Sequence, residues 1–278
     1  MLLPTIAYFL IFTYYPLAHA VVISMQQFNL IGHRPFVGMR NFLAVLADPN
    51  FWSSFRNTLV LGTGILAIGF VAPILIALSL NEVMQGWLKR SLQMIIYLPH
   101  LFSWVVVGGL WIQLLAPDGG LVNAVLWALG IPPVQFMSDP QLARWVIILV
   151  SVWKDMGFNC IIYLAAIVGI NPALYESARV DGAHRWHEII YITIPSLART
   201  MQVVALLSIM GLLRLFDQIY VMRNAVIEPQ VNVLMTYVYD QGFQQMNIGQ
   251  ATASALLILT VTLFLTLFTR RLIRYDTV

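Results

Sequence analysis

Long apolar segments alternate with short polar segments along the whole chain. A helix rises about 1.5 Å per residue, so roughly 20 apolar residues cross a bilayer. Six apolar runs reach that length, at roughly Leu2–Met25, Thr58–Leu80, Leu92–Leu115, Leu142–Ile170, Leu197–Met222 and Ile248–Thr269. The pattern predicts an all-α, polytopic membrane protein with six transmembrane helices, folded as a single domain over residues 1–278.

Composition supports a membrane protein and excludes several other classes. Hydrophobic residues make up 60% of the chain and charged residues 10%, which is too apolar for a soluble core of this length. The net charge of +3 comes from residues spread between the runs, so no basic patch for nucleic acid is present. The lone Cys160 excludes an internal disulfide and a cysteine metal cluster.

The basic residues predict how the spans are oriented. One set of connections carries eight Lys and Arg residues: Lys89, Arg90, Arg179, Arg185, Arg199, Arg270, Arg271 and Arg274. The opposite set carries five: Arg34, Arg40, Arg56, Arg144 and Arg223. By the positive-inside rule the first set is cytoplasmic, which also places both termini in the cytoplasm.

A polar segment of about 25 residues between the fourth and fifth runs has its own pattern. Asn171 followed by Pro172 is a helix-start signal, and a carboxylate early in that helix, Glu176, suits the positive end of the helix dipole. Asp181-Gly182 is a break signal, and Pro195 opens the next apolar run. Two short helices around a glycine break form a protrusion that can dock in another protein.

The spacing of this segment resembles the cytoplasmic EAA loop of bacterial ABC-importer permeases. The matching positions are Glu176, Ser177, Ala178, Gly182, Ile192 and Pro195. Ser177 stands where the family has a second motif residue, Ala, and Ile194 stands where it has Leu. The resemblance implies the type I ABC-importer permease fold, with residues 171–195 as a coupling loop. It also implies ATPase-coupling contacts by Glu176, Ser177, Ala178, Asp181, Gly182 and Ala183.

Three outer segments resemble the carbohydrate branch of this family: Gly38–Phe42, Pro117–Asn123 and Phe216–Tyr220. The outer turn Arg223–Pro229 departs from the usual Gly-Gly-Pro. Together with Ser177, this turn resembles members that handle polysaccharide fragments, including the alginate importer's permease. The resemblance implies import of a sugar or oligosaccharide across the bacterial cytoplasmic (inner) membrane. The implied partners are a second permease subunit, two ATP-binding subunits and an extracytoplasmic solute-binding protein.

The chain has no phosphate-binding Gly-x-x-x-x-Gly-Lys-Ser/Thr loop and no catalytic or zinc motif. We therefore expect a non-catalytic subunit without a cofactor or metal of its own, with ATP and Mg²⁺ bound by the partner ATPase. His184 and His187 have a metal-compatible spacing but are better explained as solvated residues of the docking loop.

Ionisable residues inside the apolar runs are candidates for the substrate pathway. Lys154 and Asp155 are neighbours that point about 100° apart on a helix, so no direct pair between them is predicted. Arg214 and Asp217 have i, i+3 spacing and can pair. The alternative is that these charges lie at the outer interface. If they line the pathway, Lys154 and Arg214 favour an acidic sugar over a neutral one.

Two helical stripes accompany these charges. Asp155, Asn159 and Tyr163 recur at i, i+4 and i+8 in the fourth run, and Ser208, Gly211, Leu212 and Leu215 form a stripe in the fifth. Amide, hydroxyl and aromatic groups suit sugar binding, and the resemblance to the maltose importer implies that both stripes line its sugar site. The alternative is helix packing, which small residues mediate in membranes.

Two rival functions remain open at this point. An ion-coupled secondary sugar transporter predicts inverted repeats and broken helices around buried acids, and the sequence shows no such symmetry. An intramembrane enzyme needs a catalytic constellation within the spans, and none is present at a useful spacing.

Overall fold

Helices joined by turns and loops make up the computed structural model, which describes residues 2–27 and 34–272. Within those ranges the β-structure is one antiparallel bridge between Gln26 and Phe36. The elements are α1 (Leu2–Phe9), η1 (Leu10–Tyr14), α2 (Tyr15–Ser24), α3 (Arg40–Ala47), α4 (Pro49–Asn81), α5 (Gly86–Leu101), α6 (Trp104–Leu114), α7 (Leu121–Ala128), α8 (Pro140–Val168), α9 (Pro172–Val180), α10 (Arg185–Glu188), η2 (Ile189–Thr193), α11 (Ile194–Leu212), α12 (Asp217–Met222), α13 (Glu228–Val231), α14 (Leu234–Tyr239), η3 (Asp240–Gln244) and α15 (Ile248–Leu272). The three η elements are π-helical.

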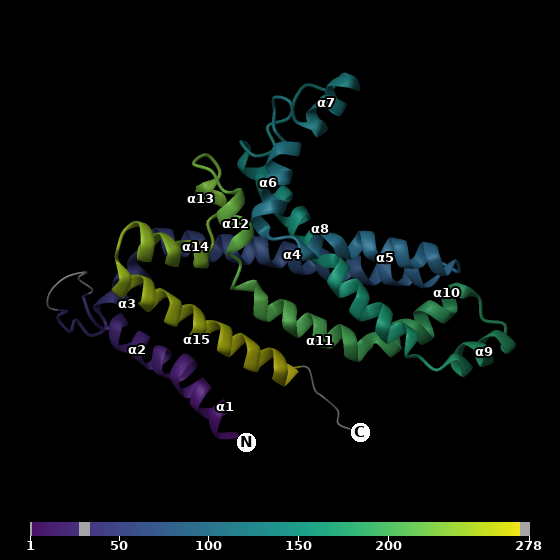
Figure 1. Ribbon diagram of the computed structural model, residues 1–278, viewed down its shortest axis with the longest axis horizontal. Coiled ribbons are helices and arrows are strands. Elements are labelled where there is room, and N and C mark those ends of the chain that lie inside the picture. Colours follow the sequence, from purple (N-terminus) through teal and green to yellow (C-terminus); the bar gives the residue numbers. More distant parts are fainter. Residues whose placement is uncertain (1, 28–33, 273–278) are drawn as a thin grey trace.

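The long helices α4 and α8 form the centre, flanked by α5 and α11 (Figure 1). Helices α4 and α8 each start at an Asp-Pro pair. The Asp48 side chain accepts a hydrogen bond from the Asn50 amide at 2.8 Å, and the Asp139 side chain accepts from the Gln141 amide at 2.8 Å. An aspartate N-cap followed by proline is a strong helix start, which explains why these spans begin there.

Buried side chains from α4, α8 and α11 form one of the packed clusters, which includes Ala77, Cys160, Tyr163 and Leu197. The α5 backbone lies close against α8. A Cβ added to Gly157 would lie 2.1 Å from the carbonyl oxygen of Ile96, so only glycine fits there.

Among the residues that the structure describes, five helices are long and apolar enough to cross a membrane: Leu2–Ser24, Pro49–Asn81, Pro140–Val168, Arg185–Leu212 and Ile248–Arg271. The sixth predicted run, Leu92–Leu115, is a broken pair, because α5 and α6 meet at an angle of 101°. Pro99 lies near the end of α5, and Ser103 caps α6 by accepting from the Val106 amide at 3.4 Å. The six-span prediction is confirmed in number only if this pair is counted as one span.

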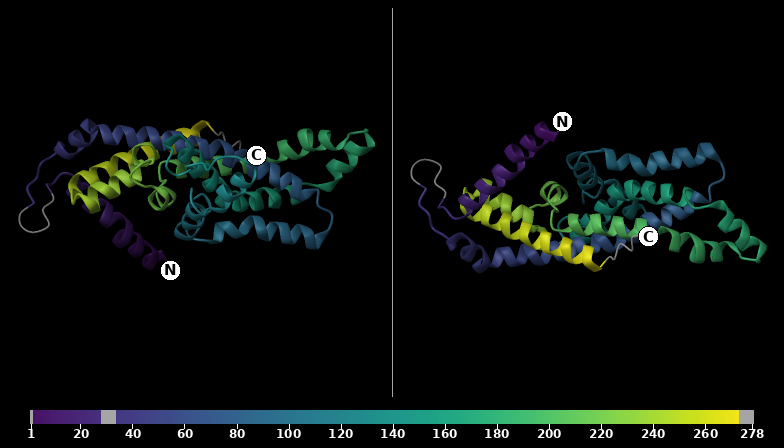
Figure 2. Two further views of the ribbon diagram at one scale, coloured as in Figure 1. Left: turned by 90° about the horizontal axis from the view of Figure 1, so that it is seen from above. Right: turned by 90° about the horizontal axis from the view of Figure 1, so that it is seen from below.

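The structure also departs from the prediction at the first and fifth apolar runs. Helix α1 projects away from the other helices and none of its residues is buried (Figure 2), whereas α2 packs against α15. The fifth run ends as a helix at Leu212, and α12 follows as a separate short helix from Asp217. Arg274, one of the predicted cytoplasmic residues, lies outside the described residues.

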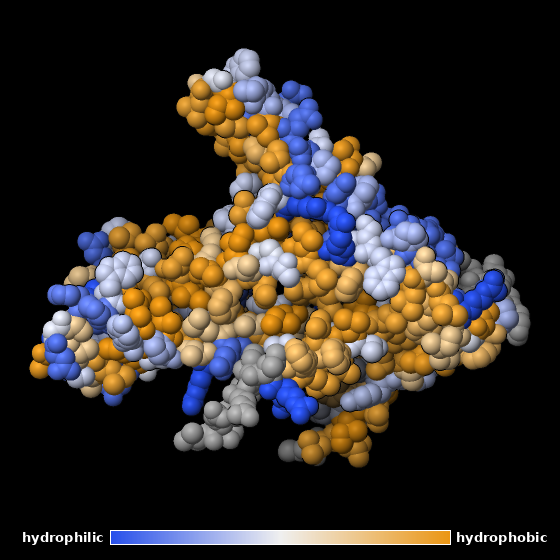
Figure 3. All heavy atoms as spheres, turned by 180° about the vertical axis from the view of Figure 1, so that it is seen from behind, coloured by the Kyte–Doolittle hydropathy of each residue, from blue (hydrophilic) through white to orange (hydrophobic). Residues whose placement is uncertain are grey.

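The 171–195 loop and α3 lie at opposite ends of the molecule (Figure 1). The face in Figure 3 is largely apolar between these ends, as expected for a surface that meets lipid or another membrane subunit. The α9–α10 hairpin projects beyond the ends of the long helices (Figure 2).

Candidate functional site

The 171–195 loop contains the two short helices that the sequence predicts. Asn171 caps α9 by accepting a hydrogen bond from the Ala173 amide at 3.0 Å. At the other end Gly182 has φ of +81°, the left-handed conformation that glycine adopts readily. The Gly182 amide donates to the Arg179 carbonyl at 3.1 Å and the Ala183 amide donates to the Ala178 carbonyl at 2.9 Å. These bonds form a Schellman motif, which explains the four-residue spacing between Ala178 and Gly182.

A buried carboxylate joins the two helices of the loop. Glu188 is only 2% exposed and accepts from the Arg179 Nε at 2.6 Å and the Arg185 Nη1 at 2.5 Å. The hydrogen bond to Glu188 raises the pKa of the Arg179 guanidinium, so Arg179 stays charged. Arg185 also donates to Glu82, at the end of α4, with Nε and Oε2 2.8 Å apart. The loop is therefore tied to α4 and to the start of the span containing α11.

The outer surface of the loop is exposed and partly apolar. Val180 is 88% exposed and Trp186 is 75% exposed, and Glu176 also reaches solvent. Glu176, Tyr175 and Arg179 border a cleft of about 290 Å³ that extends to Ile167 and Asn81. Exposed apolar side chains beside charged ones are typical of a protein-docking surface.

A second cleft lies among the long helices, with a volume of about 240 Å³; we call it the membrane cleft. From α8 it is lined by Ser151, Val152, Asp155, Met156 and Asn159, from α4 by Gly62, Ile65, Leu66 and Gly69, and from α11 and the turn after it by Ser208, Gly211, Leu212 and Leu215. The structure thus brings together six of the nine pathway residues predicted from sequence. The α4 residues were missed, although Gly62 and Gly69 repeat at seven residues, a spacing that marks one helix face.

Three pathway residues do not line the membrane cleft as predicted. Tyr163 is fully buried in the α4–α8–α11 cluster, because each i+4 step turns a helix by about 40° and eight residues carry the stripe away from the cleft. Arg214 is exposed but lies beyond the end of α11. The predicted Arg214–Asp217 pair is wrong, because the helix breaks between the two residues and no such ion pair forms within the described chain.

Lys154 is the third exception. Its ammonium is buried and lies 3.7 Å from the Asp155 carboxylate, so the prediction that these neighbours do not pair is wrong. The long lysine side chain reaches back even though the two Cβ atoms diverge. Lys154 Nζ also donates to the His100 carbonyl at 3.3 Å, and His100 Nδ1 lies 3.1 Å from Asp155. This cluster ties α8 to the end of α5, directly before the 101° break.

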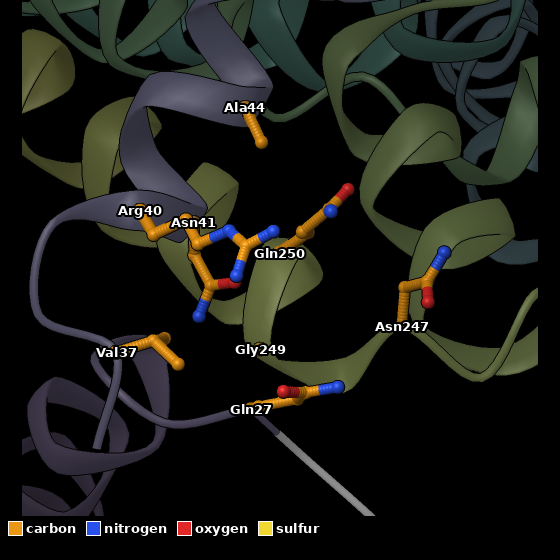
Figure 4. Close-up of a pocket in the computed structure, with 8 residues that line it drawn as sticks. All are labelled: Gln27, Val37, Arg40, Asn41, Ala44, Asn247, Gly249 and Gln250. Carbon is orange, nitrogen blue, oxygen red and sulfur yellow. The ribbon is translucent and has the colours of Figure 1, made fainter. Parts of the chain in front are cut away.

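A third cavity has a volume of about 400 Å³ and is drawn in Figure 4. It lies beside α3, at the end of the molecule opposite the 171–195 loop (Figure 1). It is lined by Gln27, Val37, Arg40, Asn41, Ala44, Asn247, Gly249 and Gln250. Asn41 donates to the carbonyls of Ser24 at 2.8 Å and Gln26 at 2.9 Å, which joins the end of α2 to α3. The Arg40 side chain points into the cavity beside Gln250 (Figure 4). Part of the predicted outer segment Gly38–Phe42 therefore builds a polar surface pocket.

No group of three or more potential metal ligands occurs within residues 2–27 and 34–272. His184 and His187 have ring centroids 6.0 Å apart on the exposed side of the loop. Two histidines without a third ligand do not make a metal site.

Comparisons with known proteins agree along most of the chain. Residues 69–275 match the family described as "Binding-protein-dependent transport system inner membrane component". The polygalacturonan/rhamnogalacturonan transport system permease protein YteP of Bacillus subtilis is 37% identical over 277 residues, covering 98% of this chain and 86% of the relative. Protein LplB of the same organism is 34% identical over 259 residues, or 92% and 81% of the two chains.

Solved structures agree with this assignment. A chain of a bacterial ABC transporter involved in the import of the acidic polysaccharide alginate aligns with a TM-score of 0.93 and 37% identity, covering 100% of this chain and 95% of that chain. The same kind of transporter in complex with an alginate pentasaccharide-bound periplasmic protein gives a TM-score of 0.91 at 37% identity, covering 99% and 92%. The all-helical permease fold is therefore confirmed.

These matches exclude the rival transporter and enzyme classes. A permease component of an ABC importer carries no cofactor, and its ATPase is a separate subunit, as the sequence predicts. The chain belongs to the binding-protein-dependent transport system inner membrane component family and is a multi-pass, non-catalytic permease of an ABC importer.

Proposed function

We propose that this chain, with a second permease subunit, imports an acidic oligosaccharide, powered by two ATP-binding subunits and supplied by an extracytoplasmic binding protein. The observation that carries the coupling half of this proposal is the exposed 171–195 loop, tied by ion pairs to the helices around the membrane cleft. The substrate class is supported by relatives named for polygalacturonan and for alginate, both polymers of uronic acids.

The ion pairs of the loop give a path for mechanical coupling. ATP binding closes the ATP-binding subunits and shifts the docked loop. Arg185 passes this shift to α4 through Glu82, while Glu188 passes it to the span that continues into α11. Helices α4, α8 and α11 surround the membrane cleft, so moving α4 and α11 relative to α8 exchanges inward-facing and outward-facing states.

Six residues of the loop have proposed roles in this coupling. Glu176 makes polar contacts with the ATP-binding subunit, and Gly182 lets the chain reverse after α9. The docking surface around them is formed by Ser177, Ala178, Asp181 and Ala183. This arrangement requires the loop, and with it both termini, to lie in the cytoplasm, in agreement with the excess of basic residues there.

The membrane cleft is the proposed sugar site of this subunit. Asp155 and Asn159 from α8 face Ser208 and Gly211 from α11 across it, which supplies polar groups for sugar hydroxyls beside an open glycine surface. The Lys154 ammonium is buried and already paired with Asp155, so we assign it no role in selecting an acidic sugar. Arg214 is exposed and does not line the cleft itself, but it lies in sequence between the cleft residues Leu212 and Leu215, and we assign it the selection of an acidic sugar.

The test is ATP hydrolysis by the reconstituted complex, stimulated by binding protein loaded with uronate or neutral oligosaccharides. We expect uronate oligosaccharides to stimulate more strongly. Arg214→Gln should reduce that preference by roughly tenfold, because a charge-assisted hydrogen bond contributes about 1.5–3 kcal/mol. Equal stimulation by neutral sugars would reject the acidic class and leave an importer of another saccharide.

A further inference from the structure

Four aromatic rings gather where the membrane cleft ends. Phe216 follows the cleft residue Leu215 directly, Tyr220 lies on α12, Tyr239 ends α14, and Phe243 lies in η3. Consecutive rings are in contact, with centroids 5.3 Å apart for Phe216 and Tyr220, 4.9 Å for Tyr220 and Tyr239, and 5.1 Å for Tyr239 and Phe243. None of the four belongs to the buried clusters of the described chain.

Phe243 is the outermost ring of this row. It stacks on Tyr239 with an interplanar angle of 27°, so Tyr239 supports one of its faces, and Phe243 remains 70% exposed. The η3 turn that carries Phe243 is π-helical. Such turns are rare in proteins, and those that occur are often at functional sites. Directly after the turn, Met246 has a φ of +58°, a conformation that a side chain such as methionine seldom adopts.

Ion pairs hold this row in place. Arg223 donates to both oxygens of Asp240, each at 2.7 Å, and joins the end of α12 to the start of η3. The Arg223 guanidinium also lies 5.2 Å from the Tyr220 ring centroid, a cation–π distance. The hydroxyl of Tyr220 donates to that of Tyr239 at 3.2 Å. The rings are therefore preorganised before any ligand arrives.

Most of the residues that follow Phe243 are polar, with the exposed Met246 as an apolar exception. Gln244, Gln245 and Asn247 next to it are exposed, and Gln241, Gln244 and Gln245 border a cavity of about 360 Å³ with Glu228. A lipid-facing ring would have apolar neighbours, as Phe264 has on α15. An aromatic face among amides is suited to a sugar ring, whose C–H face stacks on the aromatic ring while its hydroxyls bond to the amides.

We propose that Phe243, supported by Tyr239, is a stacking platform for one sugar ring of the oligosaccharide as it passes between the binding protein and the membrane cleft. This rests on the proposed function. It adds a subsite that engages only oligosaccharides long enough to reach from the cleft to η3. The platform therefore favours longer chains over shorter ones.

The test is uptake by the reconstituted complex of labelled uronate oligosaccharides of short and long length. Phe243→Ala should raise the half-saturating concentration for long oligosaccharides by about two- to tenfold, as expected for one aromatic contact, and leave short ones unchanged. Phe243→Trp should restore the wild-type half-saturating concentration for long oligosaccharides. Phe264→Ala on α15 is the matched control, because Phe264 is also exposed and stacked on another ring.

Phe243→Leu separates a sugar platform from a contact with the second permease or lipid. Leucine keeps the apolar bulk but has no aromatic face, so a sugar platform loses its preference for long chains, while an apolar contact is retained. Normal long-chain uptake by Phe243→Leu, or identical behaviour of Phe243→Ala and Phe264→Ala, overturns the platform. Failure of wild-type protein to take up any saccharide would instead reject the proposed function.

Discussion

Arg185 and Glu82 lie 103 positions apart in sequence and form a two-pronged ion pair, with Nε and Nη2 of the guanidinium bound to the two carboxylate oxygens. The pair joins the 171–195 loop to the end of α4. Both side chains are nearly half exposed, so the pair contributes little to stability. The pair connects the 171–195 loop to a helix of the membrane cleft, and this is the connection that the proposed coupling requires.

The difference in burial between Glu82 and Glu188 predicts different outcomes for matched substitutions. Glu188→Gln weakens hydrogen bonds from two arginines to a carboxylate that is itself buried, so solvent replaces them poorly. Glu82→Gln should cost less than about 1 kcal/mol. Thermal unfolding of the purified complex should show a clear decrease in melting temperature for the first variant and almost none for the second. Equal decreases would contradict this account of the loop.

Gly182 has a matched partner for testing its role. Gly130, after α7, ends its helix with the same pair of backbone hydrogen bonds and a φ of +78°, and a Cβ added there meets open space within 4 Å, as at Gly182. Valine at either site costs at least ~1–2 kcal/mol of backbone strain. We expect Gly182→Val to reduce binding-protein-stimulated ATP hydrolysis by about an order of magnitude and Gly130→Val to leave it nearly unchanged. Similar losses in both variants would show that strain alone, and not coupling, explains the effect.

Close packing of α5 on α8 predicts a strict requirement at Gly157. Alanine there places its Cβ against the Ile96 carbonyl oxygen, and backbone atoms cannot move aside cheaply, so we expect a loss of about 1–3 kcal/mol. Gly109→Ala, with nothing within 4 Å of the added Cβ, serves as the control and should be neutral. The yield and melting temperature of the detergent-solubilised protein distinguish the two; unimpaired Gly157→Ala protein would mean that the helices are further apart.

The buried Tyr163 hydroxyl has no hydrogen-bond partner among the described residues. Tyr163→Phe should therefore be neutral or slightly stabilising, while Tyr163→Ala should cost about 3–5 kcal/mol through the cavity it leaves. Asn159→Ala, one helical turn earlier in the membrane cleft, should instead weaken sugar transport and leave stability intact. Impaired transport by a fully stable Tyr163→Phe protein would place the hydroxyl in the substrate pathway after all.

The sequence predicts the elements that carry local signals. Asn171, Pro172 and Gly182 mark the ends of α9 correctly, because capping depends on a few adjacent residues. The 101° break after α5 was missed, since it lies within a run that is apolar on both sides and long enough to be one span. Pro99 and Ser103 were the available signals, and both are also common in unbroken membrane helices.

Site residues were harder to predict because their positions depend on side-chain reach and helix rotation. Helical spacing predicted that Asp155, Asn159 and Tyr163 share one helix face, and the first two do line the membrane cleft. Spacing alone did not show that Tyr163 is turned far enough around the helix to be buried in the core. Cβ directions alone did not reveal that Lys154 curls back to Asp155. His100 and the α4 residues come from other segments, and only the folded structure brings them together.

The central claim is that ATP-driven movement of the 171–195 loop opens the membrane cleft to an acidic oligosaccharide. Its most direct test is accumulation of a labelled uronate oligosaccharide in proteoliposomes that contain the complete complex, for wild type and for Glu176→Lys. We predict that wild-type uptake requires both ATP and binding protein, and that Glu176→Lys abolishes uptake and stimulated ATP hydrolysis while the complex stays assembled. Uptake driven by an ion gradient without ATP, or full uptake by Glu176→Lys, would contradict the account.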